Sequence, residues 1–149
     1  MRVEKFFGYA SIFNNTDSVN DVVLPSAFKR FNIVKQDGKT KGIKLLLNHD
    51  SNLHIGWIEK VKVDSKGLFV QGCIDKKLQH SSIGDNAIKN GFVGLSIGYY
   101  ANKFTKDSFL KKRYIHDITL DEISVVKNPA NKKAVIQSFT YQTNLSLSP

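Results

Sequence analysis

Residues 55–74, IGWIEKVKVDSKGLFVQGCI, decide the fold class, because two strand-like stretches flank a turn sequence. In the first half, Ile55, Trp57, Val61 and Val63 lie at odd-numbered positions, which puts them on one face of a strand. Asp64-Ser65-Lys66-Gly67 is a turn sequence, and the apolar run 68–74 after it is typical of a second strand. The stretch therefore predicts a β-hairpin.

Outward from this hairpin, short strand-like segments dominate the chain. The further expected strands cover residues 3–13, 42–48, 92–104, 109–115, 119–126 and 134–139. One helix is expected over 27–35, since Pro25 suits a first helical turn. A second, short helix is expected from Ser82, with a capping-box-like start, to a glycine stop at Gly91. The sequence thus predicts a mainly β fold with a few helices.

Length and composition favour one globular domain over residues 1–149, with 41% hydrophobic residues and no internal repeat or linker. The polar, uncharged tail 141–149 has no clear period, so no element is assigned to it and it can be disordered. No run of about 18 apolar residues and no signal-like start is present, and we expect a cytosolic protein. Cys73, the only cysteine, lies in a strand pattern that predicts a buried and inert thiol.

The charge favours acidic partners, because 22 Lys and Arg residues against 13 Asp and Glu residues leave a net charge of +9. Nucleic acid, an anionic membrane surface and an acidic protein segment would all be attracted to such a protein. The lysines are scattered without a long basic block, which is typical of an ordinary solvated surface. Tyr99, Tyr100, Lys103 and Phe104 give only a weak indication of a nucleic-acid-binding face.

Ser96 is the candidate nucleophile because it lies between two glycines, in Gly94-x-Ser96-x-Gly98. The same pattern forms the nucleophile elbow of α/β-hydrolases, but that turn requires a helix directly after the serine. Here strand-like residues follow, and the order of candidate residues differs, so the elbow is disfavoured. A serine on a strand with small neighbours still allows close approach of a substrate backbone.

Four histidines are candidates for the general base: His49, His54, His80 and His116. His49 is the strongest, since it follows a buried apolar strand that would hold its backbone rigid. A structural role for a lone histidine remains the competing interpretation. The spacing of His49 and His54 lacks the i, i+4 pair and the cysteines of a zinc site, and we expect no metal and no other cofactor.

Four segments, in the same order, resemble the tailed-phage prohead protease family. They are GYASIF (8–13) with DVVLPSAF (21–28), LLNHD (46–50) with IG (55–56), GLSIGY (94–99), and LDEISVV (120–126) with PAN (129–131). Each motif alone is common, whereas the four in order span residues 8 to about 136 and form a specific signal. Ser26 departs from the glycine that the family commonly has at this position.

The resemblance implies a fold similar to herpesvirus assembly proteases, which is an antiparallel β-barrel flanked by helices. It also implies a catalytic triad of His49, Ser96 and Glu122, the acid of the Glu-Ile-Ser segment. His116 is the alternative third member, because herpesvirus relatives use a second histidine. An ion pair with a lysine is the competing interpretation of Glu122, although an acid among apolar neighbours is costly without a partner.

The implied activity is that of a serine endopeptidase of phage prohead maturation. Backbone N–H groups at Ala130 and Asn131 are the oxyanion-hole candidates. The implied partners are the scaffold and major capsid protein as substrates and the protease itself, inside the assembling prohead in the host cytoplasm. A homo-oligomer is compatible with this, whereas no membrane or nucleic-acid partner is expected. The competing functions are a non-catalytic capsid-assembly component and a basic nucleic-acid-binding domain.

Overall fold

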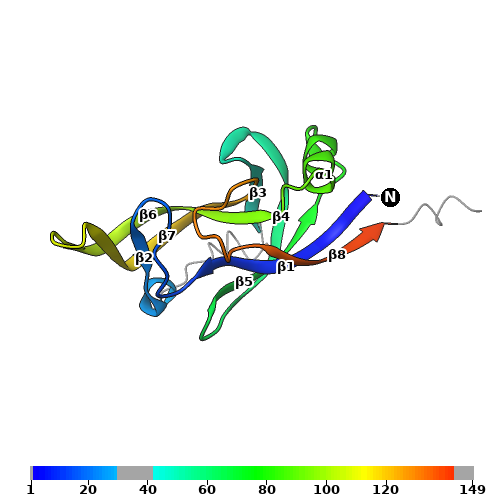
Figure 1. Ribbon diagram of the computed structural model, residues 1–149. Coiled ribbons are helices and arrows are strands. Elements are labelled where there is room, and N and C mark those ends of the chain that lie inside the picture. Colours follow the sequence, from blue (N-terminus) through cyan, green and yellow to red (C-terminus); the bar gives the residue numbers. More distant parts are fainter. Residues whose placement is uncertain (1, 30–41, 143–149) are drawn as a thin grey trace, which may run out of the picture.

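Eight strands form one sheet in the computed structural model, which describes residues 2–29 and 42–142 (Figure 1). The strand order is β2-β7-β3-β4-β5-β1-β8, and β6 pairs with the other edge of β7. β7 pairs parallel with β2 and β3, and the remaining pairs are antiparallel. The strands are β1 (Arg2–Ile12), β2 (Asp21–Val23), β3 (Ile43–Leu47), β4 (Asp50–Val63), β5 (Gly67–Ile74), β6 (Gly94–Asp107), β7 (Lys112–Val126) and β8 (Ile136–Gln142).

The β4–β5 hairpin confirms the prediction made from its alternating pattern. Asp64 shapes the turn, because its Oδ1 accepts hydrogen bonds from the backbone N–H groups of Lys66 (2.8 Å) and Gly67 (3.0 Å). An aspartate that bonds its own backbone in this way mimics a backbone turn. The local sequence alone therefore sets the position of this hairpin.

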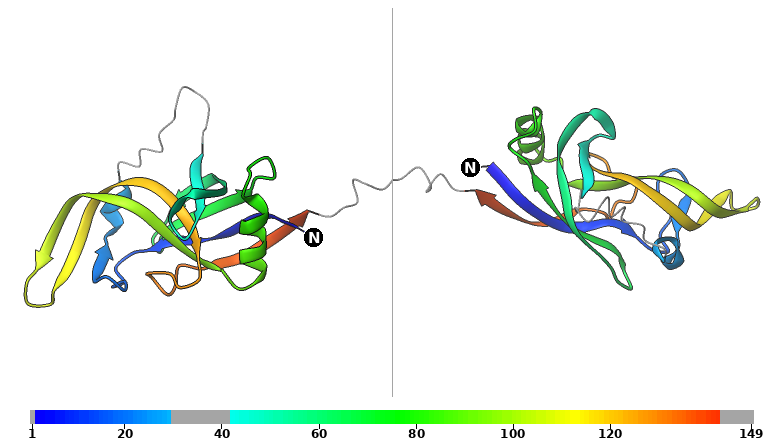
Figure 2. Two further views of the ribbon diagram at one scale, coloured as in Figure 1. Left: turned by 90° about the horizontal axis from the view of Figure 1, so that it is seen from above. Right: turned by 180° about the vertical axis from the view of Figure 1, so that it is seen from behind.

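The sheet curls toward a barrel without closing, as the views in Figure 2 show. At the beginning of β6, Gly94 forms an isolated bridge with Val135, and Leu95 N–H donates to Ala134 O at 2.8 Å. Within the described residues, no continuous ladder joins β6 to β8. The mainly β class with few helices is confirmed, but the expected barrel is an open, curled sheet.

One α-helix, α1 (Ser81–Lys89), lies among the described residues and packs against β4. Its end at Gly91 confirms the predicted glycine stop, since this residue has φ of +97°. The predicted capping box at Ser82 is wrong. The residue before the first helical turn is His80, and no side chain caps that end.

The other predicted helix is only partly within the described residues. Pro25–Phe28 form a 3₁₀ turn, η1, with the proline in its first turn as expected. Residues 30–35 of the predicted helix lie outside the described residues, as do 143–149 of the predicted tail. No helix in the described part of the chain has the length and apolar content needed to cross a membrane.

β7 is a single strand where the sequence predicts two, at 109–115 and 119–126. Its partner β6 runs alongside it over its full length. The pairing of the two strands shifts register near Lys103 and then continues. Residues 116–118, which separate the two expected strands, are kept extended by the continuous pairing with β6. The tip of the hairpin lies instead between Asp107 and Lys112, away from the rest of the sheet (Figure 1).

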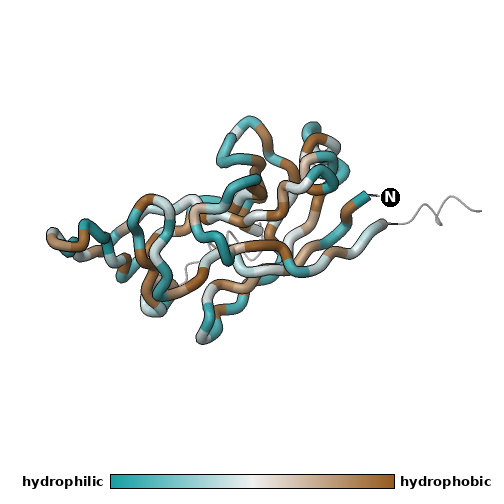
Figure 3. The backbone as a smooth tube through the Cα atoms, viewed as in Figure 1, coloured by the Kyte–Doolittle hydropathy of each residue, from teal (hydrophilic) through white to brown (hydrophobic). Residues whose placement is uncertain are grey.

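The core consists of aliphatic and aromatic residues on the inner face of the curled sheet. Hydrophobic and hydrophilic residues alternate along the strands, as expected for a half-buried sheet (Figure 3). The largest fully buried hydrophobic side chains are Phe6, Leu45, Ile55, Leu68, Val70, Leu95, Ile115, Ile123 and Val125. Leu95, Ile123 and Val125 alternate with polar residues on the other face, so core packing fixes the backbone that carries those polar residues.

Candidate active site

His49 lies on a two-residue turn that joins β3 to β4. Asn48 and His49 have φ of +53° and +58°, as the two central residues of a tight hairpin require. Asparagine and histidine tolerate this conformation better than most residues do. Asn48 N–H donates to Val125 O at 3.0 Å, and His49 N–H donates to Ser124 Oγ at 3.0 Å. Two hydrogen bonds therefore fasten the turn to β7.

Ser96 and Glu122 lie on the same face of the β6–β7 hairpin. In the register of this pair, Ser96 is opposite Ser124, and Gly98 is opposite Glu122. Side chains two residues apart on a strand share a face, so all four positions point to one side.

The two glycines beside Ser96 make room for other parts of the site. A Cβ atom on Gly98 would lie within 2.1 Å of Glu122 Oε1, and one on Gly94 within 2.6 Å of Pro129 Cδ. The sequence interpretation explained the glycines by the approach of a substrate backbone. It missed that they make room for Glu122 and Pro129. The Glu122 carboxylate occupies the space that a side chain at residue 98 would fill, and Gly94 lets Pro129, in the loop after β7, pack against the beginning of β6.

The three side chains form a continuous chain of hydrogen bonds. His49 Nε2 lies 3.1 Å from Ser96 Oγ, and His49 Nδ1 is paired with Glu122 Oε1. The His49 side chain is 41% exposed, whereas that of Glu122 is 8% exposed. The acid is thus removed from solvent while the imidazole and the serine hydroxyl remain accessible to another molecule. Such an arrangement can transfer a proton from the hydroxyl to the imidazole.

Ser124 is a polar residue of the site that the sequence interpretation missed. Its hydroxyl accepts a hydrogen bond from the backbone N–H of His49 and donates one to Glu122 Oε2 at 2.7 Å. The residue is fully buried. Ser124 therefore positions both partners of the ion pair. The Glu-x-Ser spacing on a strand was the only available sign, because it places the two side chains on one face.

Glu122 raises the pKa of His49 above its ordinary value of 6.5, because the hydrogen bond to the carboxylate favours the charged imidazolium. A general base must be neutral, so we expect kcat/KM for an uncharged peptide to rise with pH through an apparent pKa above 6.5. Initial rates between about pH 5 and pH 9 measure this. The variant His116→Ala should have the same profile. A rising limb centred below 6.5 would contradict the assignment of His49 as the base.

The structure brings Ala130 and Asn131 to Ser96, and does not bring His116 there. Ala130, Asn131 and Ser96 line one cavity, and within the described chain the N–H groups of Ala130 and Asn131 donate no hydrogen bond. His116 Nε2 lies 3.0 Å from Thr105 Oγ1. It is eight residues along β7 from Ser124, about 25 Å at the usual strand rise.

The remaining candidate residues have local partners. His54 Nε2 lies 2.8 Å from Gly56 O, and its ring meets that of Trp57 edge to face. Cys73 is half-buried where full burial was expected, and burial raises the pKa of its thiol. Among the described residues, no group of three or more His, Cys, Asp or Glu side chains could hold a metal ion.

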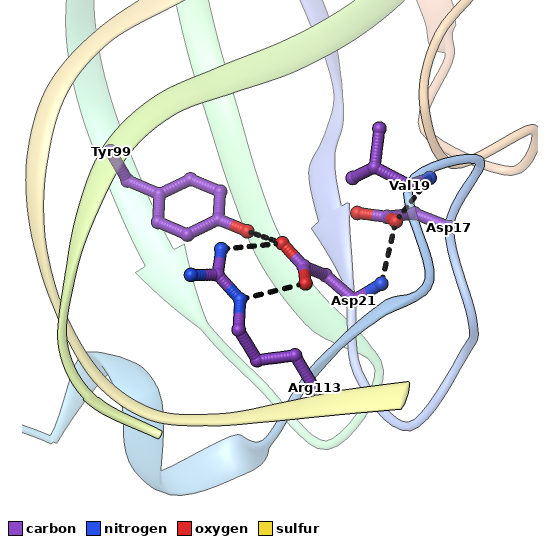
Figure 4. A network of polar contacts seen from close by, with 5 residues as sticks. All are labelled: Asp17, Val19, Asp21, Tyr99 and Arg113. Atoms are coloured by element: carbon purple, nitrogen blue, oxygen red, sulfur yellow. Dashed lines mark hydrogen bonds and ion pairs between the residues drawn. The ribbon is translucent and has the colours of Figure 1, made fainter. Parts of the chain in front are cut away.

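Beside Ser96 lies a cavity of about 130 Å³ that the sequence interpretation also missed. Asp17, Asp21 and Tyr99 line it, and Arg113 joins them in the polar network of Figure 4. Arg113 binds Asp21 through two hydrogen bonds of 2.9 and 2.8 Å, and Tyr99 donates a third of 2.9 Å. The Tyr99 hydroxyl is therefore engaged by Asp21 within the fold.

A curled β-sheet with a serine, a histidine and a buried glutamate joined in this way has the form of a β-sheet serine peptidase. The chain belongs to the caudovirus prohead serine protease family, whose family model matches residues 2–146. This confirms the resemblance seen in the four sequence motifs.

One relative in sequence and one solved structure of similar fold describe the range of this similarity. The prohead protease of Enterobacteria phage HK97 is 37% identical over 136 residues, which cover 88% of this chain and 58% of that protein. The chain thus spans less than two thirds of the length of that relative. The crystal structure of KSHV protease in complex with a hexapeptide phosphonate inhibitor has a TM-score of 0.61 at 13% identity, covering 99% of this chain and 69% of that one. At this identity the likeness concerns the fold.

Proposed function

We propose that this chain is a serine endopeptidase domain that cleaves proteins during the maturation of a phage prohead. The observation that carries the proposal is the hydrogen-bonded chain Ser96–His49–Glu122 in a member of the prohead protease family. Nothing in this chain of contacts requires a cofactor, because a positioned base is sufficient to activate a serine hydroxyl.

Ser96 Oγ attacks the carbonyl carbon of the scissile peptide bond, and His49 Nε2 accepts the hydroxyl proton. His49 then delivers this proton to the leaving amine, and water repeats the sequence to release the acyl group from Ser96. Glu122 keeps the proton-bearing Nδ1 of His49 directed toward itself and stabilises the imidazolium that forms. Ser124 holds the second carboxylate oxygen in place.

The oxyanion of the tetrahedral intermediate requires N–H donors, and we assign this role to the backbone of Ala130 and Asn131. Their loop follows β7 and lies at the cavity that Ser96 also lines. Donors held by a folded backbone are already oriented when the negative charge develops, so no reorganisation is needed at that moment. Gly94 supports this geometry, since a side chain there would push Pro129 away.

The proposed substrates are the scaffold, or a scaffolding segment of the capsid protein, and the protease itself, within the assembling prohead in the host cytoplasm. The net charge of +9 would assist the encounter with acidic segments of such partners. In these terms the chain acts as one protease domain.

The test is to incubate the purified protein with the capsid and scaffold proteins encoded beside it and to identify fragments by mass spectrometry. We expect discrete fragments of a substrate, of the protease, or of both. Absence of any cleavage, together with tight binding to duplex DNA, would contradict the proposal and favour a nucleic-acid-binding domain.

A further inference from the structure

The cavity beside Ser96 is placed to receive one side chain of a bound substrate, provided that the proposed function is right. The scissile carbonyl must lie with its carbon at Ser96 Oγ and its oxygen toward the N–H groups of Ala130 and Asn131. Both groups line the cavity. The substrate side chain nearest to the cavity therefore belongs to the residue that supplies this carbonyl, which is the residue on the acyl side of the scissile bond.

The walls of this cavity suit an alkyl chain. Its aliphatic lining residues are Ala10, Ile12, Val19, Val23, Leu95 and Ile97. Most of these residues are buried in the core, which fixes the shape of the walls. A flexible, unbranched side chain can place its methylene groups against such walls and keep a polar end for a specific partner.

The polar end of the cavity carries one uncompensated negative charge. Asp21 is neutralised by Arg113, whereas Asp17 has no ion pair within the described residues. Asp17 Oδ1 accepts the N–H groups of Val19 and Asp21, both at 2.9 Å, and in the described chain no donor is bound to its Oδ2. Burial raises the pKa of Asp17, as expected for a carboxylate that lacks a counterion.

Size and charge together select one type of side chain. A cavity of about 150 Å³ in another protein binds benzene, so the 130 Å³ here accommodates a group of similar or smaller size. A lysine side chain has one non-hydrogen atom fewer than benzene, and an arginine side chain has one more. We propose that this cavity is the specificity pocket for the acyl-side residue and that Asp17 selects lysine by pairing with its ammonium group.

The test compares two peptidyl diphenyl phosphonates that differ only in the acyl-side position, lysine in one and norleucine in the other. Norleucine has the same carbon chain without the ammonium group. We expect the lysine compound to label Ser96 between about 10 and 100 times faster, the range of one charged hydrogen bond. The rate of labelling is measured by intact mass, with the modified residue located by peptide mapping.

The variant Asp17→Asn should bring the two labelling rates together. Asparagine keeps the Oδ1 acceptor for the Val19 and Asp21 N–H groups, so the loop stays folded while the charge is lost. The control Asp107→Asn removes a carboxylate at the tip of the β6–β7 hairpin, outside the cavity, and should retain the preference.

Three results would overturn the inference. Equal labelling by the two compounds in the unmodified protein would show that the pocket does not select a cation. A lysine preference that survives in Asp17→Asn would remove Asp17 as its cause. Failure of both compounds to label Ser96 would contradict the proposed function itself, and the pocket assignment with it.

Discussion

Replacing Ser96 with alanine should reduce cleavage of a protein substrate by about 10⁶-fold, because the nucleophile and its base act as a unit. The fold should remain, since Ser96 lies at the accessible edge of the site. Its hydroxyl is hydrogen-bonded to the partly exposed ring of His49, so the substitution leaves no buried group without a partner. We expect the free energy of unfolding to change by less than about 1 kcal/mol. Cleavage is measured by gel and mass spectrometry, and folding by circular dichroism.

A double-mutant comparison gives this prediction its control. His49→Ala should lose as much activity as Ser96→Ala, and the double variant should be scarcely worse than either single one. Residues with separate structural roles would instead give additive losses. A folded Ser96→Ala protein that still cleaves at the original rate would disprove the serine mechanism.

Replacing Glu122 with glutamine should lower turnover by about 10⁴-fold while the strand remains intact. The substitution keeps the volume that packs against Gly98 but removes the charge that orients His49 and stabilises its protonated form. Because the hydrogen bond to Glu122 is the main cause of the raised pKa of His49, the rising limb of the pH profile should also move to lower pH. Steady-state rates over a range of pH measure both effects.

His116→Ala is the matched control for the glutamate variant. The imidazole of His116 contacts Thr105 on the neighbouring strand, so its loss should leave turnover nearly unchanged. A larger loss of activity in His116→Ala than in Glu122→Gln would favour a triad with His116 as its third member over the one proposed here.

Local patterns in the sequence were sufficient for the elements whose physical causes are local. The β4–β5 hairpin follows from alternating apolar residues and from an aspartate that bonds its own turn. The end of α1 follows from the freedom of Gly91 to adopt positive φ. The position of His49 directly after a buried strand was likewise correct, although no local pattern indicated that its backbone occupies a tight turn.

Errors arose where long-range pairing overrides a local signal. The sequence predicted a break between two strands at residues 116–118, but β6 supplies hydrogen-bonding partners along β7 and keeps the strand continuous. Ser82 predicted a helix cap by its residue type, yet the helix begins one residue earlier and has no side-chain cap. Backbone groups take whichever partners the whole fold supplies, and a short window of sequence does not contain them.

The sequence by itself determined the family and the mainly β class, because the order of the motifs can be read along the chain, and through the family resemblance it supplied the proposed triad. Only the tertiary structure placed Ser124 between His49 and Glu122, and Asp17 in the cavity beside Ser96. The contact of Ser124 with His49 and the position of Asp17 beside Ser96 both join residues far apart in the chain. They exist because the register of β3, β6 and β7 is fixed by burial of their apolar faces, and that register is a property of the assembled sheet.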